Sequence, residues 1–107
     1  VSGVPRKAIV TSEAVREALL EPLEELVDTI KAVIAKLTPE LANELIDNGL
    51  VLFGGGALLF GIDRYLSDRI GMPVRIADSP DRTVVQGVLR CLEKYDRWKS
   101  VLMKAAE

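Results

Sequence analysis

The sequence predicts an α/β fold in which parallel strands are joined by crossover helices. Two short apolar runs, "LVLF" at residues 50–53 and "PVRIA" at residues 73–77, have the length and composition of strands, and we expect the first to be buried. Helical patterns follow each of them, at residues 57–71 and from residue 79 to the end. An order of strand, helix, strand and helix favours parallel pairing with a right-handed crossover.

Length and composition limit the classes of function. The chain has 107 residues, so it forms one small domain or part of a larger one. Its 14 basic and 16 acidic residues are interspersed, and no basic stripe predicts a nucleic-acid partner. The absence of histidine excludes His-based metal sites and Ser-His or Cys-His catalysis within this chain. The single Cys91 cannot form an internal disulfide, which favours a cytoplasmic setting. Because the chain begins with Val, we expect an excised fragment.

The first third of the chain predicts a strand followed by helices. The β-branched opening "VPRKAIV" at residues 4–10 predicts a strand, and Thr11 or Ser12 can cap the helix after it. Proline inside a helix removes a hydrogen bond and costs about 3 kcal/mol. We therefore expect a helix break near Glu21, with a second, longer helix that has Pro22 in its first turn. Apolar residues follow helical spacing at Val15, Leu19, Leu23, Leu26, Ile30, Val33 and Leu37.

Capping residues predict the bounds of the later helices. Thr38 and Pro39 begin a short helix that Asn48-Gly49 ends, and Gly71 stops the next one. Asp78 and Asp81 flank Ser79-Pro80 after the second strand, where we expect them to form the turn and cap the following helix. The alternative is a role near a bound nucleotide.

The last segment predicts a helix to the chain end with a break near Tyr95. Cys91 lies among Val88, Leu89 and Leu92, which predicts a small buried core residue. Beyond the break an apolar face is formed by Tyr95, Trp98, Val101 and Leu102. This face is either exposed or covered by self-association, and we expect the isolated chain to dimerise.

Three consecutive glycines join the first buried strand to the helical segment near Ala57. Ligands of open α/β sheets bind at the carboxyl ends of strands, and glycine lets a ligand approach the backbone closely. Two interpretations remain open at this point: a tight turn, or a turn against which a nucleotide lies. No Gly-Lys-Ser/Thr follows, so Gly54–Gly56 are not a phosphate loop, and their spacing is not that of Gly-x-Gly-x-x-Gly.

Nearly the whole chain resembles a known family. The stretches "VTSEAVREALLEPLEELVDTIKAVI" and "TPELANELIDNGLVLFGGGALLFGIDRYLSDRIGMPVRIADSP" are similar to the C-terminal third of the MreB family of bacterial actin-like proteins. The resemblance implies a partial actin-like ATPase (ribonuclease H-like) domain. Residues 1–11 would then hold a strand of the neighbouring subdomain, and residues 12–107 would hold the helices and the strand–turn–helix. Phe60 departs from the family, which often has a basic residue in this segment.

The resemblance also implies a nucleotide site. In actin-like ATPases the strand–glycine–helix element is the adenosine motif, so Gly54, Gly55, Gly56, Ala57 and Leu58 would line the adenosine end of ATP. The phosphate-binding hairpins and the carboxylates associated with Mg²⁺ come from earlier parts of such proteins. Phosphoryl transfer depends on positioning and charge neutralisation around the γ-phosphate. We therefore expect ATP and Mg²⁺ in the parent protein, and neither catalysis nor tight nucleotide binding by this chain alone.

By the same resemblance, the parent would be a filament-forming cytoskeletal protein that determines rod cell shape. It would be cytoplasmic and membrane-associated, with wall-synthesis and membrane proteins as partners. One alternative is a non-catalytic protein-interaction module that kept the actin-like fold. Another is a cell-division or chaperone relative, but the continuous match from Val10 to Val74 favours MreB.

Overall fold

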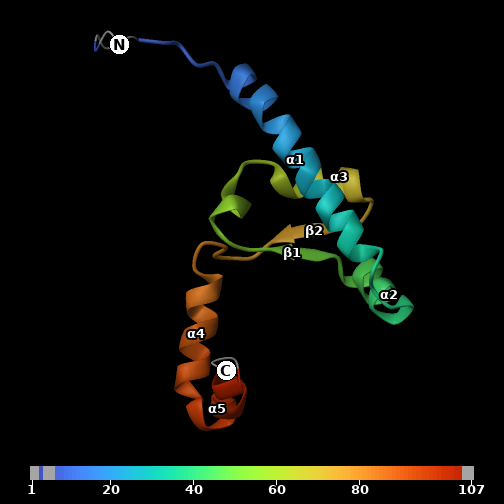
Figure 1. Cartoon of the computed structure of the whole chain (residues 1–107), viewed down its shortest axis with the longest axis vertical. Helices are drawn as coiled ribbons and strands as arrows, with labels where there is room; N and C mark the ends of the chain where they lie inside the picture. The colour runs from blue at the N-terminus through green and yellow to red at the C-terminus, as the bar shows by residue number, and fades with distance from the viewer. Residues whose placement is uncertain (1–2, 4–6, 105–107) are drawn as a thin grey trace. The chain divides into compact units, whose positions relative to one another are not determined.

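The computed structural model describes residue 3 and residues 7–104, with only the backbone at residues 102 and 104. The chain divides into two compact units, Val1–Leu37 and Thr38–Glu107, and each is described by itself (Figure 1).

The first unit is built on one long helix, α1 (Ser12–Ile34). The side chain of Thr11 caps it, because its hydroxyl accepts a hydrogen bond from the backbone N–H of Ala14 at 3.2 Å. The helix continues through Pro22, so the predicted break near Glu21 is wrong. Pro22 and Ala18 are both exposed, so water can reach the Ala18 carbonyl that has lost its intrahelical donor. A continuous helix also keeps the apolar stripe on one face.

The strand predicted at residues 4–10 is not found in its described part. Residues 7–10 form neither helix nor strand, and Ile9 is 95% exposed. A strand needs a hydrogen-bonding neighbour, and the sheet in the described residues pairs only β1 with β2. Residues 4–6 lie outside the described residues.

The second unit begins with α2 (Pro39–Asn48), whose predicted bounds are confirmed. The hydroxyl of Thr38 accepts a hydrogen bond from the N–H of Leu41 at 3.5 Å, and Gly49 ends the helix with φ +70°. A Cβ at Gly49 would lie 2.9 Å from the Cβ of Pro73 and against its carbonyl oxygen. Only glycine therefore lets the chain pass from α2 into the sheet beside Pro73.

The two predicted strands are confirmed as a parallel pair. β1 (Leu50–Leu52) and β2 (Val74–Ile76) pair in the register Leu50 with Val74, Val51 with Arg75 and Leu52 with Ile76. β1 is half-buried rather than buried as predicted, with Val51 40% exposed, and β2 has the same burial pattern. A pair of strands covered on one face leaves alternate side chains exposed.

The crossover between the strands holds a 3₁₀ turn, η1 (Gly55–Leu58), and the helix α3 (Ile62–Ile70). The regular helix thus begins five residues later than the predicted start near Ala57. The extended Leu59 and the left-handed Gly61 (φ +79°) interrupt the helical path. α3 packs against β2 and η1, and the buried side chains of this crossover are Ala57, Ile62 and Leu66. Gly71 ends α3 in the left-handed conformation, as predicted.

After β2 the chain forms a helical hairpin of α4 (Thr83–Glu93) and α5 (Tyr95–Lys104), and these helices pack on each other (Figure 1). The predicted break near Tyr95 is confirmed. The predicted cap by Asp81 is wrong, because Arg82 occupies the cap position and no side chain caps α4. Asp81 instead lies 3.8 Å from the Arg82 side chain. Cys91 is half-buried rather than buried, because much of the apolar surface of α4 remains exposed.

The start of α2 should be sensitive to pH. A hydrogen bond from its own backbone N–H, assisted by the Thr38 hydroxyl, holds the pKa of Glu40 below its ordinary value of 4.5. A lowered pKa stabilises the folded state above that ordinary value, and the stabilisation is lost as the pH falls through the folded-state pKa. Thr38→Ala should raise the pKa of Glu40 in an NMR titration, whereas Thr11→Ala, at the start of α1, should leave it unchanged. An unchanged Glu40 pKa in Thr38→Ala would show that the cap does not act on this carboxylate.

Candidate functional site

The glycine turn lies at the carboxyl end of β1 and is tied to the segment that follows β2. The N–H of Gly54 donates to the carbonyl of Pro80 at 2.6 Å, and the N–H of Ala77 donates to the carbonyl of Leu52 at 2.9 Å. Within the turn, the N–H of Ala57 donates to the carbonyl of Gly54 at 3.1 Å. These bonds fix the turn at the sheet edge where parallel α/β sheets bind ligands.

The three glycines differ in what the fold requires of them. Gly54 has φ +93° and ψ 165°, a conformation open essentially to glycine alone. Gly55 and Gly56 have no such φ, and a Cβ at either position would meet no atom within 4 Å. Both are exposed at the start of η1. A tight turn therefore explains Gly54 but not Gly55 and Gly56, where the backbone is left bare toward open space.

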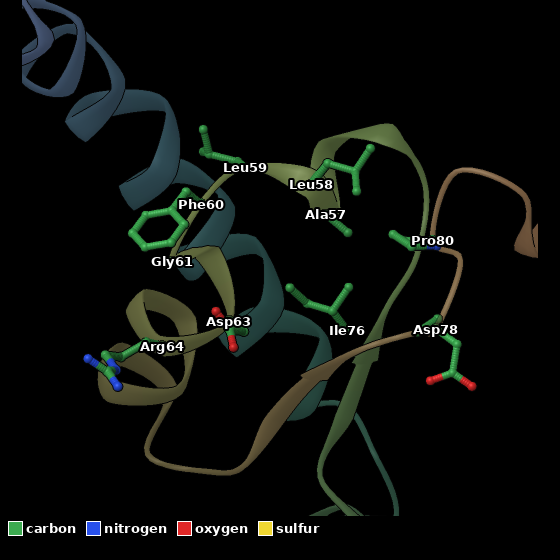
Figure 2. Close-up of a pocket in the computed structure, with 11 residues that line it drawn as sticks. Ala57, Leu58, Leu59, Phe60, Gly61, Asp63, Arg64, Ile76, Asp78 and Pro80 are labelled. Carbon is green, nitrogen blue, oxygen red and sulfur yellow. The ribbon is translucent and has the colours of Figure 1, made fainter.

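A pocket of about 580 Å³ is lined in part by the residues that directly follow the glycine turn (Figure 2). Its lining residues come from the η1–α3 segment and from the end of β2: Ala57, Leu58, Leu59, Phe60, Gly61, Asp63, Arg64, Ile76, Ala77, Asp78 and Pro80. Figure 2 shows Ile76 extending from β2 toward Ala57, while the carboxylate of Asp78 points away from the turn. The lining is mostly apolar with a few charged side chains at its edges, as in many small-molecule sites.

Two of the five predicted site residues, Ala57 and Leu58, line this pocket. Gly54, Gly55 and Gly56 immediately precede Ala57 in the chain but are not among the lining residues. Sequence reasoning did not place Ile76, Ala77 and Pro80 at this site, and it gave Asp78 a role near a nucleotide only as an alternative. The available signal was that the carboxyl ends of two parallel strands meet at one edge of a sheet.

Within residue 3 and residues 7–104, no group of three or more His, Cys, Asp or Glu side chains could hold a metal ion. No helix of the same residues is both long and apolar enough to cross a membrane.

Comparison with known proteins decides the family. A sequence model of the MreB/Mbl protein family matches residues 1–100. The chain belongs to the MreB/Mbl family. It is 43% identical over 97 residues to the cell shape-determining protein Mbl of Bacillus cereus, which covers 91% of this chain and 29% of that protein. It is 40% identical over 94 residues to the cell shape-determining protein MreB of Escherichia coli, covering 88% of this chain and 27% of that protein.

Solved MreB structures share the fold. MreB 5 of Spiroplasma citri bound to AMPPNP matches with a TM-score of 0.83 and 32% identity, over 91% of this chain and 29% of that one. The same protein bound to ADP matches with a TM-score of 0.83 and 33% identity, over 92% and 30% of the two chains. The predicted fold class, a partial actin-like α/β domain with parallel strands, is confirmed. The chain spans less than a third of the length of these MreB/Mbl relatives.

The different backbone conformations of the glycines predict different effects of alanine. Gly54→Ala should destabilise the fold by about 1–3 kcal/mol, because alanine strains this φ and ψ. Gly55→Ala and Gly56→Ala should leave stability unchanged or raise it by up to about 1 kcal/mol, because the unfolded chain loses freedom. Urea denaturation of the three variants measures this difference. Equal destabilisation by all three would show that the turn itself requires every glycine.

Proposed function

We propose that this chain is the segment of an ATP-binding, filament-forming cytoskeletal protein that supplies the adenosine side of the nucleotide site. The parent protein would determine rod cell shape, in keeping with the names of its MreB and Mbl relatives. Gly54, Gly55, Gly56, Ala57 and Leu58 would contact the adenosine.

The observation that carries this proposal is the bare backbone at Gly55 and Gly56. The fold leaves space for a Cβ at both positions and imposes no positive φ on either. Glycine there is useful when another molecule must come close to the backbone, since even a methyl group would keep it at a distance. The neighbouring pocket offers about 580 Å³, within the 300–1,000 Å³ typical of small-molecule sites.

The relatives support the identity of that molecule. The two Spiroplasma citri structures are of an MreB 5 bound to AMPPNP and to ADP, which are both adenine nucleotides. Because this chain matches about 30% of that protein, most of any nucleotide site would come from the remainder of the parent. The phosphate-binding and Mg²⁺-associated groups would belong to that remainder, and so would ATP hydrolysis. This chain alone would neither turn over ATP nor bind it tightly.

Self-association is the second part of the proposal. The α4–α5 hairpin exposes large apolar side chains on both helices: Val84, Val85, Val88, Leu89, Leu92, Tyr95, Trp98, Val101 and Met103. An exposed apolar surface of this kind supports a contact with another protein surface. The parent would assemble into filaments in the cytoplasm at the membrane, together with wall-synthesis and membrane proteins. The isolated chain would dimerise through its exposed apolar surface, and we propose no nucleic-acid partner.

Sedimentation equilibrium of the isolated chain tests the dimer. The chain should sediment as a dimer at high concentration, and Leu89→Glu on α4 should shift it to monomer by placing a charge in the contact. Ile46→Glu on α2 is the control, because Ile46 is 60% exposed but lies outside the hairpin. A monomer at all concentrations would contradict dimerisation.

Nucleotide binding is tested on the full-length parent. Gly55→Ala and Gly56→Ala should each weaken ADP binding about 5- to 150-fold, because a methyl group forced against a close-packed ligand costs about 1–3 kcal/mol. Isothermal titration calorimetry measures the affinity. Gly87→Ala is the matched control, since Gly87 lies within α4 with no atom within 4 Å of an added Cβ. Absence of ADP binding by the unmodified parent would favour the alternative, a non-catalytic interaction module that kept the fold.

A further inference from the structure

The residues that follow the glycine turn expose an unusual run of large apolar side chains. Leu58, Leu59 and Phe60 are 63%, 41% and 103% exposed. Phe60 is as accessible as it would be in an extended peptide, so none of the described residues covers its ring. Single exposed apolar residues are common, but three consecutive ones at the mouth of a pocket mark a binding surface.

The fold holds this run in place. Ala57 before it and Ile62 after it are each only 6% exposed, so both ends are anchored in the interior. The N–H of Leu59 donates to the carbonyl of Gly56 at 3.2 Å, and the N–H of Ile62 donates to the carbonyl of Leu59 at 3.1 Å. The exposure of Phe60 is therefore set by a hydrogen-bonded turn between two buried anchors, which presents the ring outward.

Phe60 lines the same pocket as the residues beside the glycine turn. In Figure 2 its ring stands on one side of the pocket and Pro80 stands on the opposite side, with Ile76 between them. The guanidinium of Arg64 points away from the centre of this view. The interior is thus apolar, with an aromatic face at its rim, which suits a flat ring system better than a phosphate group.

We propose that the base of the bound nucleotide stacks on the ring of Phe60. This inference rests on the proposed nucleotide-binding function. A base is favoured over a protein side chain because Phe60 lines the same pocket as Ala57 and Leu58, which directly follow the bare backbone of Gly55 and Gly56 in the chain. The carboxylate of Asp63, which also lines the pocket, can accept hydrogen bonds, and adenine and ribose carry N–H and O–H donors. Base–aromatic stacking tolerates different bases, so Phe60 would add affinity more than selectivity among them.

The test uses the full-length parent and ADP. Phe60→Leu keeps an apolar side chain but removes the ring, and it should weaken ADP binding about tenfold or more. Phe60→Trp keeps a ring and should retain the affinity of the unmodified protein, and ADP should quench the fluorescence of the new tryptophan. Phe53→Leu is the matched control, because Phe53 is the other phenylalanine of the chain, is 59% exposed and does not line the pocket. It should leave ADP affinity unchanged.

The outcomes separate this inference from the function on which it rests. If Phe60→Leu binds ADP like the unmodified protein while Gly55→Ala and Gly56→Ala bind it poorly, the stacking role is wrong and the nucleotide site stands. If Phe60→Leu changes filament pelleting but not ADP affinity, Phe60 is a protein contact and the inference is overturned. If the unmodified protein binds no ADP, the proposed function and the inference both fail.

Discussion

The parallel pairing of β1 with β2 is the constraint on which the second unit depends. Three residue pairs form it, and hydrogen bonds extend it at both ends, from Leu50 to Pro73 and from Ala77 to Leu52. At one end Gly49 makes the close approach to Pro73 possible. At the other end the short bond from Gly54 to Pro80 joins the two segments that leave the sheet. Because parallel strands need a crossover connection, this pairing also brings η1 and α3 back over the sheet.

Next to this strand pair, three adjacent glycines have different structural roles. Gly54 is used by the fold, since its conformation and its bond to Pro80 close the turn. Gly55 and Gly56 have no such role in the turn, and an added Cβ at either position would face open space. A site built from a fixed turn loses little conformational entropy when a ligand binds. The exposed backbone of Gly55 and Gly56, which the turn itself does not require, therefore supports the adenosine-binding role that we propose.

Local sequence rules predicted much of this structure. Thr38, Gly49 and Gly71 set helix ends through side-chain capping and left-handed backbone, which depend on few neighbours. The rules were wrong where the local structure depends on exposure to solvent or on pairing with a distant segment. Helix α1 continues through Pro22 because that position is exposed, and residues 7–10 have no strand partner among the described residues. The pocket could be predicted only in part, because Ala57 and Leu58 share it with Ile76–Pro80, about twenty residues later in the chain.

Membership in the MreB/Mbl family gives these features a common explanation, since this chain corresponds to less than a third of its relatives. Half-buried strands and an exposed α4–α5 hairpin would be expected if this chain packs against the remainder of the parent protein that we propose. The most direct test of the account is a crystal structure of the full-length parent with ADP. The adenosine should lie in van der Waals contact with the backbone of Gly55 and Gly56. ADP bound elsewhere, with these two glycines exposed to solvent, would contradict it.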